Sequence, residues 1–573
     1  MTSSQPLRLG SLPLSLLLLG ATGTAQGELY RFQGDSPGDS LDAASGAGDV
    51  NGDGFADLIV GMHRDDNNGL FSGTARVYSG ADGLLLYNFE GNNAYDFFGI
   101  SVSGAGDVNA DGFADVIIGA SQESTRGSAR VCSGLDGTTL YTFLGDLPDD
   151  QFGTSVSAAG DVNNDGHDDV IVGAYGHDSA GFYTGMARVF SGVDGTVLYT
   201  FLGDSESAWF GFSVDGVGDL DNDGHDDVVV GAPYDTAGGN LGSARALSGA
   251  DGSILYTFRG TIPFGNFGRA VAGAGDVNAD GSPDIIVGEP FGAWSAGIVR
   301  VFSGVDGSVL REFFGDSRTD HCGSAVDGAG DMNGDGFGDL IVGSYRSGSG
   351  GWQSGKARVI SGFDSMTLYT FDGPGSGMEF GISVSSAGDV DGDGRDEVIV
   401  ASRNDGVFYG AGTARVFSCC EDLATSFCFG DGSGNACPCG SPGQIGHGCA
   451  NTSGYGARIW AVSVDSDPNV SMTIAVAGAT PNAANLFFQG QTALNGGLGI
   501  PFGGGLRCTG NPVKRLGVVF TNAGGAAQRT LNPALDLGVT LGDTRHYQGW
   551  YRDSHAPACA AGFNLTDAIE IRW

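Results

Sequence analysis

The sequence predicts an all-β protein: a seven-bladed β-propeller closed by its N-terminal strand, followed by a small disulfide-rich, β-sandwich-like domain. An acidic, glycine-containing pattern recurs seven times, with start points at 49, 107, 161, 219, 276, 331 and 389. Each repeat also holds four short runs rich in β-branched and aromatic residues, which favour strands. Four strands in each of seven regular repeats are typical of a propeller.

The third unit illustrates the four expected strands. They cover residues 152–157, 169–174, 187–190 and 197–201. Only six copies of the fourth run follow a third run inside the array, and the last unit ends at residue 418 without one. The missing copy stands at residues 29–32, so we expect this N-terminal strand to complete the last blade. Closure of this kind removes exposed strand edges.

The acidic pattern has oxygen side chains at positions one, three, five and nine, and glycine at position six. Alternating side chains can converge on one cation, glycine permits the sharp turn, and the position-seven carbonyl adds an oxygen. The expected ligands, in loop order, are Asp49, Asn51, Asp53, Phe55, Asp57; Asp107, Asn109, Asp111, Phe113, Asp115; Asp161, Asn163, Asp165, His167, Asp169; Asp219, Asp221, Asp223, His225, Asp227; Asp276, Asn278, Asp280, Ser282, Asp284; Asp331, Asn333, Asp335, Phe337, Asp339; Asp389, Asp391, Asp393, Arg395 and Glu397.

This ligand set favours Ca²⁺ over Mg²⁺, because Ca²⁺ takes six to eight protein oxygens. His167 and His225 stand at position seven, so they need to contribute only a backbone carbonyl oxygen to the metal site. An EF-hand, the competing interpretation, requires glutamate at position twelve and flanking helices, whereas position twelve here is valine or isoleucine inside a strand. We therefore expect up to seven Ca²⁺ ions with a structural role, since three or four carboxylates in each loop repel one another without a cation.

The repeats resemble the FG-GAP repeats of integrin α subunits over residues 28–418, about two thirds of the chain. Five units carry the Phe-Gly pair and one carries Gly231-Ala232-Pro233, whereas the first and sixth units depart with Leu41-Asp42 and Cys322-Gly323. The resemblance implies a calcium-binding propeller with an adhesion or ligand-binding role. The five matching pairs begin at Phe98, Phe152, Phe210, Phe267 and Phe380.

The two ends of an up-and-down propeller differ in their sequences. The metal loops and the Ser-Gly-x-Asp-Gly turns share one face and repeat closely, whereas the loops of the opposite face diverge. Divergent loops are where specificity can reside. Their aromatic residues are either ligand anchors or packing between blades; the tentative ligand-binding residues are Tyr183, Trp209, Trp294, Trp352 and Tyr409.

One arginine recurs in every third strand. Seven copies favour a structural ion pair over ligand recognition. The arginines are Arg76, Arg130, Arg188, Arg245, Arg300, Arg358 and Arg415.

The net charge of the chain and its N-terminal sequence indicate where the protein is located and which partners it is expected not to bind. The formal net charge of −40 disfavours nucleic acid and anionic membranes. Residues 1–25 read as a secretory signal, with Arg8, a short apolar run and small residues before the cleavage site. The apolar run is too short for a transmembrane anchor. We expect a secreted, extracellular or cell-surface protein without a transmembrane anchor, and a monomer.

Residues 419–573 form a separate cysteine-rich β domain, which resembles terminal modules of secreted bacterial proteins. Eight of the ten cysteines lie here, and export favours disulfides, although zinc is an alternative for the cluster 428–449. Strand-like runs at 459–464, 471–476, 486–489, 517–521, 547–552 and 568–572 suggest a small sandwich. Cys132 and Cys322, outside this region, are expected to be buried.

The function expected from these features is a secreted, calcium-binding propeller that acts as an adhesion or ligand-binding module for an extracellular protein or glycan. A structural envelope or matrix protein without a specific ligand is the alternative, and an exported hydrolase or carbohydrate-active enzyme is a third. Residues 34–38 match the Gly-x-Ser-x-Gly pattern, but they lie in an ordinary interblade loop rather than a strand-to-helix turn. We therefore expect no catalytic residues.

Overall fold

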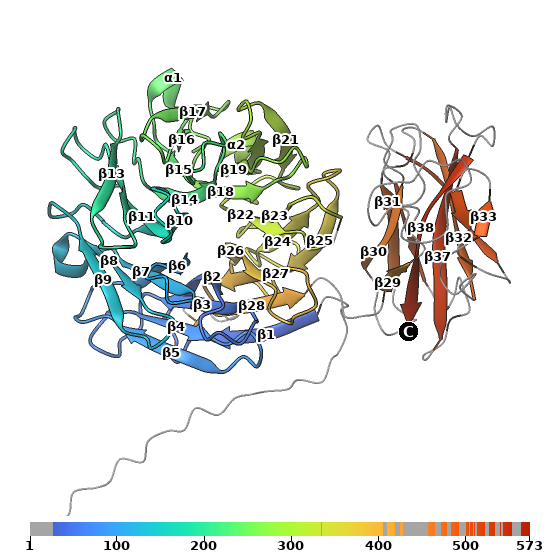
Figure 1. Cartoon of the computed structure of the whole chain (residues 1–573), viewed down its shortest axis with the longest axis horizontal. Helices are drawn as coiled ribbons and strands as arrows, with labels where there is room; N and C mark the ends of the chain where they lie inside the picture. Colours follow the sequence, from blue (N-terminus) through green and yellow to red (C-terminus); the bar gives the residue numbers. More distant parts are fainter. Residues whose placement is uncertain are drawn as a thin grey trace, which may run out of the picture.

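The computed structural model describes residues 27–404 apart from residue 334, residues 410–418, and within 424–572 the strands and a few adjoining residues. Seven four-stranded antiparallel sheets stand around a common axis as the blades of a propeller (Figure 1). Within a blade the strands follow one another from the axis outward, and the innermost strands of successive blades contact one another around the whole ring. The seven-bladed all-β architecture is confirmed.

The blades have closely similar strand lengths. Blades one to three contain β2 (Leu41–Gly48), β3 (Asp57–Met62), β4 (Thr74–Tyr78), β5 (Leu85–Glu90); β6 (Phe98–Gly106), β7 (Asp115–Ala120), β8 (Ser128–Cys132), β9 (Thr139–Leu144); β10 (Ser155–Gly160), β11 (Asp169–Ala174), β12 (Met186–Phe190) and β13 (Val197–Leu202). Blades four to six contain β14 (Ser213–Gly218), β15 (Asp227–Ala232), β16 (Ser243–Leu247), β17 (Ile254–Arg259); β18 (Ala270–Gly275), β19 (Asp284–Glu289), β20 (Ile298–Phe302), β21 (Val309–Phe314); β22 (Ala325–Gly330), β23 (Asp339–Gly343), β24 (Lys356–Ile360) and β25 (Thr367–Asp372).

The seventh blade joins strands from both ends of the array. Its inner strands are β26 (Phe380–Gly388), β27 (Glu397–Ser402) and β28 (Thr413–Ser418), and its outer strand is β1 (Gly27–Gln33). The antiparallel ladder pairs Phe32 with Ala414, so the predicted closure of the ring is confirmed.

The Phe-Gly pair does more than open the first strand. In the third unit β10 begins only at Ser155, while Phe152 forms a parallel bridge with Gly127 of the preceding blade. The expectation that the strand starts at residue 152 is therefore wrong by three residues in this unit. Gly153 has a φ of 81°, and a Cβ there would meet the carbonyl oxygen of Ser128 at 2.0 Å, so both the conformation and the close approach require glycine.

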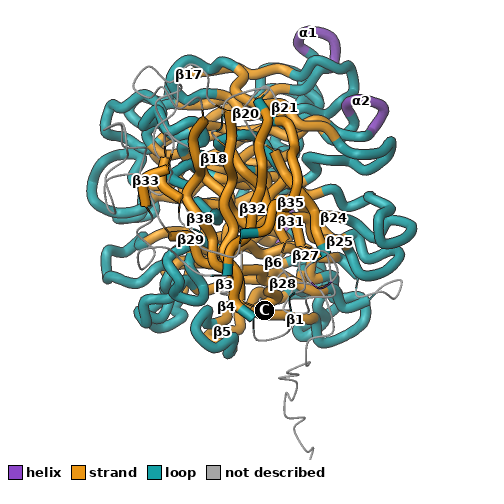
Figure 2. Tube along the Cα trace, turned by 90° about the vertical axis from the view of Figure 1, so that its right-hand side faces the viewer, coloured by secondary structure: helices purple, strands orange, loops and turns teal. Residues whose placement is uncertain are grey.

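Each blade buries its second strand completely. All residues of β3, β7, β11, β15, β19, β23 and β27 are buried, and the apolar clusters combine residues of adjacent blades. The short helices η1 (Glu123–Thr125), α1 (Ala237–Asn240) and α2 (Gly292–Ser295) are single turns in loops between second and third strands. Figure 2 shows α1 and α2 in purple. None of the helices in the described part of the chain has the length and apolar character needed to cross a bilayer.

The C-terminal region contains two further sheets. One has the order β29 (Ala424–Phe427), β38 (Phe563–Arg572), β37 (Thr544–Arg552), β32 (Ala484–Gly490), β35 (Lys514–Phe520), and the other β30 (Arg458–Ser463), β31 (Met472–Ala477), β36 (Ala527–Leu531). A small hairpin joins β33 (Ile500–Phe502) to β34 (Gly505–Arg507).

Both C-terminal sheets contribute to one apolar core. Ile459 and Ile474 of the three-stranded sheet are fully buried with Phe487 and Tyr547 of the five-stranded sheet. This shared core agrees with the expected sandwich. The eight clustered cysteines lie outside the described residues, so their disulfides or zinc stay predictions. Cys132 and Cys322 are buried free thiols, as expected.

Candidate metal loops and the opposite face

The seven acidic loops each connect the innermost strand of a blade to its second strand. In the first loop, Asp49 Oδ1 accepts a hydrogen bond from the amide of Asp53 at 3.0 Å, and its Oδ2 accepts one from Gly54 at 2.9 Å. The position-six glycines are all left-handed, as the sequence predicts for this turn. Their φ values are 90° at Gly54, 90° at Gly112, 89° at Gly166, 91° at Gly224, 93° at Gly281, 87° at Gly336 and 86° at Gly394.

The position-nine carboxylate is fully buried in every loop. Asp57 Oδ2 accepts a hydrogen bond from the amide of Val50 at 2.8 Å, and its Oδ1 accepts one from Gly80 at 2.9 Å. Gly80 belongs to the turn between the third and fourth strands. The metal loops and these turns therefore lie on the same face, as expected, and one carboxylate ties them together.

Burial raises the pKa of all seven position-nine carboxylates. It raises the pKa of Asp57 to about 6, of Asp169 to about 7 and of Glu397 to about 8, and carboxylates of the same loop add to the effect. The pKa of Asp393 in the seventh loop is also raised, first by burial and then by the charge of Asp391. A cation bound in such a loop would supply the opposing positive charge. The pKa values of Asp115, Asp227, Asp284 and Asp339 are also raised, first by burial.

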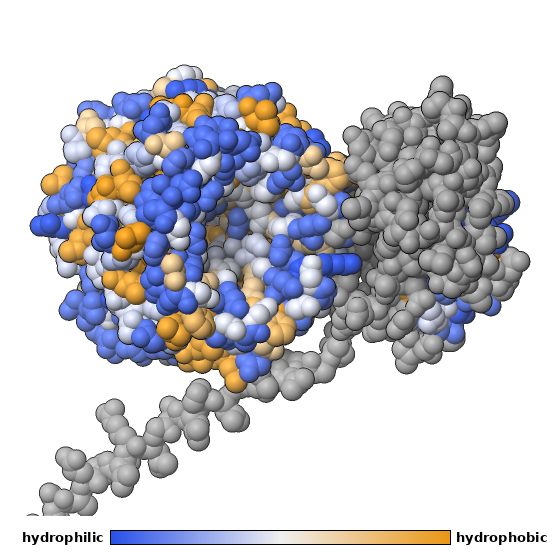
Figure 3. All heavy atoms as spheres, in the orientation of Figure 1, coloured by the Kyte–Doolittle hydropathy of each residue, from blue (hydrophilic) through white to orange (hydrophobic). Residues whose placement is uncertain are grey.

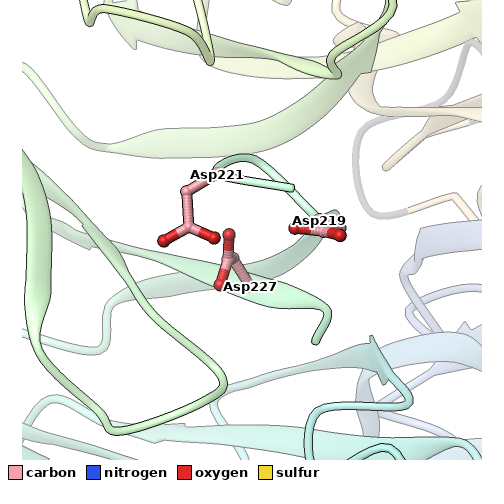
Figure 4. Close-up of side chains that lie close together, drawn as sticks. All are labelled: Asp219, Asp221 and Asp227. Atoms are coloured by element: carbon pink, nitrogen blue, oxygen red, sulfur yellow. The ribbon is translucent and has the colours of Figure 1, made fainter. Parts of the chain in front are cut away.

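Two loops bring three carboxylates together tightly enough for a cation. The ligand atoms of Asp219, Asp221 and Asp227 lie within 4.8 Å of one another (Figure 4). The equivalent residues Asp389, Asp391 and Glu397 form the second such group. Both groups use positions one, three and nine, and within the described residues the position-five aspartate belongs to neither. The other five loops have asparagine at position three, which contributes an amide oxygen instead of a carboxylate.

The seventh loop also has oxygens that no protein donor satisfies. Asp389 Oδ1 and Glu397 Oε1 are buried and make no hydrogen bond. Buried carboxylate oxygens without a donor are costly unless a cation or water binds them. The residues present therefore fit a hard divalent cation.

The two position-seven histidines use their rings elsewhere. His167 Nδ1 lies 3.0 Å from the carbonyl oxygen of Val108, and His225 Nδ1 lies 2.8 Å from that of Val162. Both carbonyls belong to the preceding metal loop. The imidazoles therefore link neighbouring loops and leave the backbone carbonyl as the candidate ligand.

On the opposite face, some of the aromatic residues that were predicted to bind a ligand lie close together and others lie apart. Trp209 lies 4.9 Å from Tyr175 and 6.3 Å from Tyr183, as ring centroids. Trp294 and Trp352 are 80% and 61% exposed on the loops of blades five and six. Tyr409, together with the neighbouring Phe408, lies outside the described residues. The structure thus joins Tyr183 and Trp209, but not the two exposed tryptophans.

The sequence reasoning missed one position that recurs on this face. The residue before each Phe-Gly pair, or its equivalent, is left-handed although it is never glycine. Residues other than glycine adopt this conformation uncommonly, and those that do cluster at functional sites. Two features of the sequence could have revealed this position. It always directly precedes the Phe-Gly pair or its equivalent, and its residue type differs from blade to blade. The seven residues are Ser40, Phe97, Gln151, Trp209, Asn266, His321 and Glu379.

The recurring third-strand arginines are mostly structural, as expected. Arg188 Nη2 lies 2.6 Å from Oδ2 of Asp146, a residue that follows the fourth strand of the preceding blade. Arg130, whose preceding loop has Asn92 at that place, instead lies over the ring of Phe98 at 4.5 Å. The remaining ion pairs join Arg76 to Asp35, Arg245 to Asp204, Arg300 to Glu289 and Glu312, Arg358 to Asp316, and Arg415 to Glu28.

Known proteins share the repeats of this ring. The FG-GAP repeat matches residues 43–78, 98–132, 152–190, 210–246 and 267–302, which are the first five blades. Integrin alpha-5 of Xenopus laevis is 32% identical over 216 residues, and integrin alpha-V of Gallus gallus is 30% identical over 214 residues. Each of these two alignments covers 34% of this chain and 20% of the relative, so the chain spans about a fifth of the length of those integrin subunits.

An integrin subunit of another animal shows a similar match. Integrin alpha pat-2 of Caenorhabditis elegans is 30% identical over 235 residues, or 36% of this chain and 18% of the relative. The sixth and seventh blades lie outside the matched stretches, yet they have the same four-stranded form and metal loop. The repeats, the relatives and the blades agree: the ring of this protein is an integrin-α-like FG-GAP β-propeller.

Proposed function

We propose that this protein is a secreted, calcium-stabilised propeller that binds an extracellular ligand on the face opposite its metal loops. The observation that carries the calcium assignment is the pair of buried, unsatisfied oxygens on Asp389 and Glu397. The ligand-binding role is supported by the similarity to integrin α subunits and by the varied, strained loops of the opposite face.

Calcium would act as a structural ion. Side-chain oxygens of positions one, three, five and nine and the position-seven backbone carbonyl would hold it in each loop, with an amide oxygen at position three in five of the loops. A cation there offsets the repulsion between carboxylates and fixes the loop against the Ser-Gly-x-Asp-Gly turn through the position-nine residue. The chemistry needs no redox change, and oxygen ligands in this number favour Ca²⁺ over Mg²⁺.

Secretion and a ligand complete the proposal. The predicted signal at residues 1–25 lies outside the described residues, as do the cysteines that favour an oxidising compartment. The domain boundaries 28–418 and 419–573 are proposed from the end of the repeats. An extracellular protein or glycan is the proposed partner, and the protein would work as a monomer without catalytic residues.

Two measurements test the parts separately. Isothermal titration with Ca²⁺ after chelation should give several sites per chain, and Glu397→Gln together with Asp389→Asn should remove one of them. An array of extracellular matrix proteins and glycans, probed with the native protein and with Trp209→Ala, tests the ligand. No Ca²⁺ binding would contradict the first part, and no specific spot on the array would favour the structural-envelope alternative.

A further inference from the structure

Backbone hydrogen bonds between blades join most of the metal loops to one another. The blades surround a central hollow (Figure 3), so each loop has one neighbour before it and one after it. At five junctions the N–H of position eight, the residue after the candidate carbonyl ligand, donates to the carbonyl oxygen of position one in the preceding loop. These bonds run from Ala56 to Asp389 at 3.0 Å, Ala114 to Asp49 at 3.0 Å, Asp168 to Asp107 at 3.4 Å, Asp226 to Asp161 at 3.4 Å and Gly338 to Asp276 at 2.9 Å.

The donor of each bond belongs to the same peptide group as a candidate metal ligand. In the second loop, the carbonyl of Phe113 at position seven and the N–H of Ala114 at position eight are the two ends of one peptide group. Because this group is planar, a carbonyl whose direction is fixed also fixes the direction of the N–H. Ligation at the Phe113 oxygen would therefore help to hold the Ala114 N–H on the carbonyl oxygen of Asp49.

The acceptor of each bond also belongs to a candidate ligand. Asp49 contributes the first ligand side chain of its loop, and its carboxylate accepts hydrogen bonds from the amides of Asp53 and Gly54. A hydrogen bond to the carbonyl oxygen of Asp49 restricts the backbone of the residue around which the loop turns. A loop that its neighbour has already ordered in this way loses less conformational entropy when it binds a cation.

Aspartate side chains add a second bond at two of the junctions. Asp168 Oδ2 accepts a hydrogen bond from the amide of Asp107 at 2.7 Å, and Asp226 Oδ2 accepts one from the amide of Asp161 at 2.9 Å. At these junctions, position eight therefore binds both the N–H and the carbonyl oxygen of position one. The second and third loops are thus each held at two points by the loop that follows.

The junction between loops four and five cannot form the backbone bond. Position eight of the fifth loop is Pro283, which has no N–H to donate to the carbonyl oxygen of Asp219. The two loops still touch, because Asn222 Nδ2 donates a hydrogen bond to Ser282 Oγ at 3.0 Å. That bond joins side chains and does not include the peptide group of the candidate ligand. Among the described residues, the junction of loops six and seven also lacks the backbone bond.

We propose that cation binding by linked neighbouring loops is positively coupled through the peptide group between positions seven and eight, and that Pro283 interrupts this coupling between loops four and five. The inference rests on the proposed calcium function and specifies how its sites are regulated. Coupling between two binding sites is reciprocal, so each linked loop raises the affinity of the other. The net contribution of one hydrogen bond corresponds to a change of about 2- to 10-fold in affinity.

Electrostatic repulsion alone would not distinguish the junctions in this way. Cations in adjacent loops repel each other whether position eight is alanine or proline. Ala114 and Pro283 are both uncharged, so these two residues differ chiefly in the presence of the N–H. A comparison of loops one and two with loops four and five therefore separates the effect of the hydrogen bond from the effect of charge.

Hydrogen exchange during a Ca²⁺ titration of the full-length protein tests the coupling. Mass spectrometry of peptic fragments gives, for each loop, the Ca²⁺ concentration at half-maximal protection. Asp107→Asn with Asp111→Asn disables loop two and should raise this concentration for loop one by about 2- to 10-fold. The equivalent pair in loop five, Asp276→Asn with Asp280→Asn, should leave the value for loop four unchanged.

Substitutions at position eight provide matched controls. Ala114→Pro copies the proline of loop five and should make loop one independent of loop two. Ala114→Gly keeps the N–H, as Gly338 does in blade six, and should preserve the dependence. Pro283→Ala introduces an N–H and should make loop four depend on loop five. Melting temperatures in saturating Ca²⁺ confirm that the variants are folded.

The outcomes distinguish the coupling from the calcium function itself. Equal shifts of loop one and loop four, or a dependence of loop one on loop two that persists in Ala114→Pro, would overturn the coupling. Protection that rises with Ca²⁺ independently in every loop would also overturn the coupling but would leave the calcium function intact. Exchange that does not respond to Ca²⁺ in any loop would contradict both.

Discussion

Tyr30 of the N-terminal strand lies directly opposite Val416 of the last propeller strand in an antiparallel ladder. Strands from the two ends of the ring sequence therefore share one blade. Tyr30 also packs on Gly83 of blade one, where a Cβ would meet its ring at 2.8 Å. The same contact joins Tyr87 to Gly137 and Tyr141 to Gly195, so β1 repeats the interblade contact of an ordinary outer strand.

Removal of β1 should open the ring. A chain that begins after Gly34 would expose the ladder groups of β28 and the apolar surface now covered by Phe32, whose ring lies 4.2 Å from that of Tyr78. We expect aggregation or local fraying even in saturating Ca²⁺, measured by light scattering and hydrogen exchange. In the intact protein, the amides of Tyr30 and Phe32 should be as protected as those of Tyr199 and Phe201.

A permuted chain provides the control for ring closure. When residues 27–33 are placed after Ser418 through a Gly-Asp-Gly turn, in a chain without residues 419–573, the protein should again be a monomer. Rapid exchange at Tyr30 and Phe32 in the native protein, with the other outer strands protected, would contradict the closure.

Calcium removal should lower the melting temperature by many degrees. Extracellular calcium sites commonly have dissociation constants of about 10⁻⁴–10⁻³ M, so at about 10 mM free Ca²⁺ each contributes about 1.4–2.7 kcal/mol. Seven such sites sum to about 10 kcal/mol or more, which is comparable with the stability of a whole domain. The measurement is a thermal melt in Ca²⁺ and in EGTA, and identical curves would refute a structural role.

Two of the recurring arginines should contribute very differently to the free energy of unfolding. Arg300 and Glu289 are buried, with Arg300 Nη1 2.6 Å from Glu289 Oε2, whereas the partner of Arg188 is the half-exposed Asp146. Arg300→Met leaves a buried carboxylate without its cation, and we expect a loss of about 3–5 kcal/mol. Arg188→Met should cost about 0.2–1 kcal/mol.

Chemical unfolding of the two arginine variants measures the difference. The double variant Arg300→Met with Glu289→Met separates the ion pair from the packing, because it removes both charges. It should recover most of the lost stability. An equal loss of stability in Arg300→Met and Arg188→Met would show that burial does not determine how much each ion pair contributes to stability.

Two carboxylates on the innermost strands should make stability depend on pH. Asp215 Oδ1 accepts a hydrogen bond from Ser157 Oγ at 2.5 Å, and Asp327 Oδ2 accepts one from the amide of Ser386 at 3.3 Å. Burial raises the pKa of Asp215 to about 6, and burial with the charge of Asp215 raises the pKa of Asp327 to about 8. Both values lie above the ordinary value near 3.9.

The sign of this dependence follows from proton uptake. Between about pH 4 and pH 8 the folded protein binds more protons at these two groups than the unfolded chain does, so their contribution to stability falls as pH rises. Asp327→Asn should therefore raise the melting temperature at pH 8 and have little effect at pH 5, in saturating Ca²⁺. Asp82→Asn, on an exposed turn, is the control, and a pH-independent effect of Asp327→Asn would contradict the assignment.

Local sequence determined most of the fold and the metal loops. The period-two runs, the glycine and aspartate turns and the acidic loop are each contained within about twelve residues, and their chemistry depends on neighbours in sequence. Counting the fourth-strand runs even located β1, because every other blade has its own. The buried state of Asp57 and its six equivalents follows from their place at the start of a fully buried strand.

Tertiary structure decided the surface of the opposite face and the partners of the arginines. Phe291, His321 and Tyr345 lie more than 20 residues apart from one another in the sequence, yet the side-chain rings of Phe291 and Tyr345 lie 4.6 Å and 5.4 Å from that of His321, because the propeller places the loops of blades five and six side by side. The same geometry brings Asp146 to Arg188 and makes Phe152 bridge Gly127 instead of opening its strand. Contacts between blades depend on the angle and spacing at which neighbouring sheets pack, and no local pattern in the sequence encodes that arrangement.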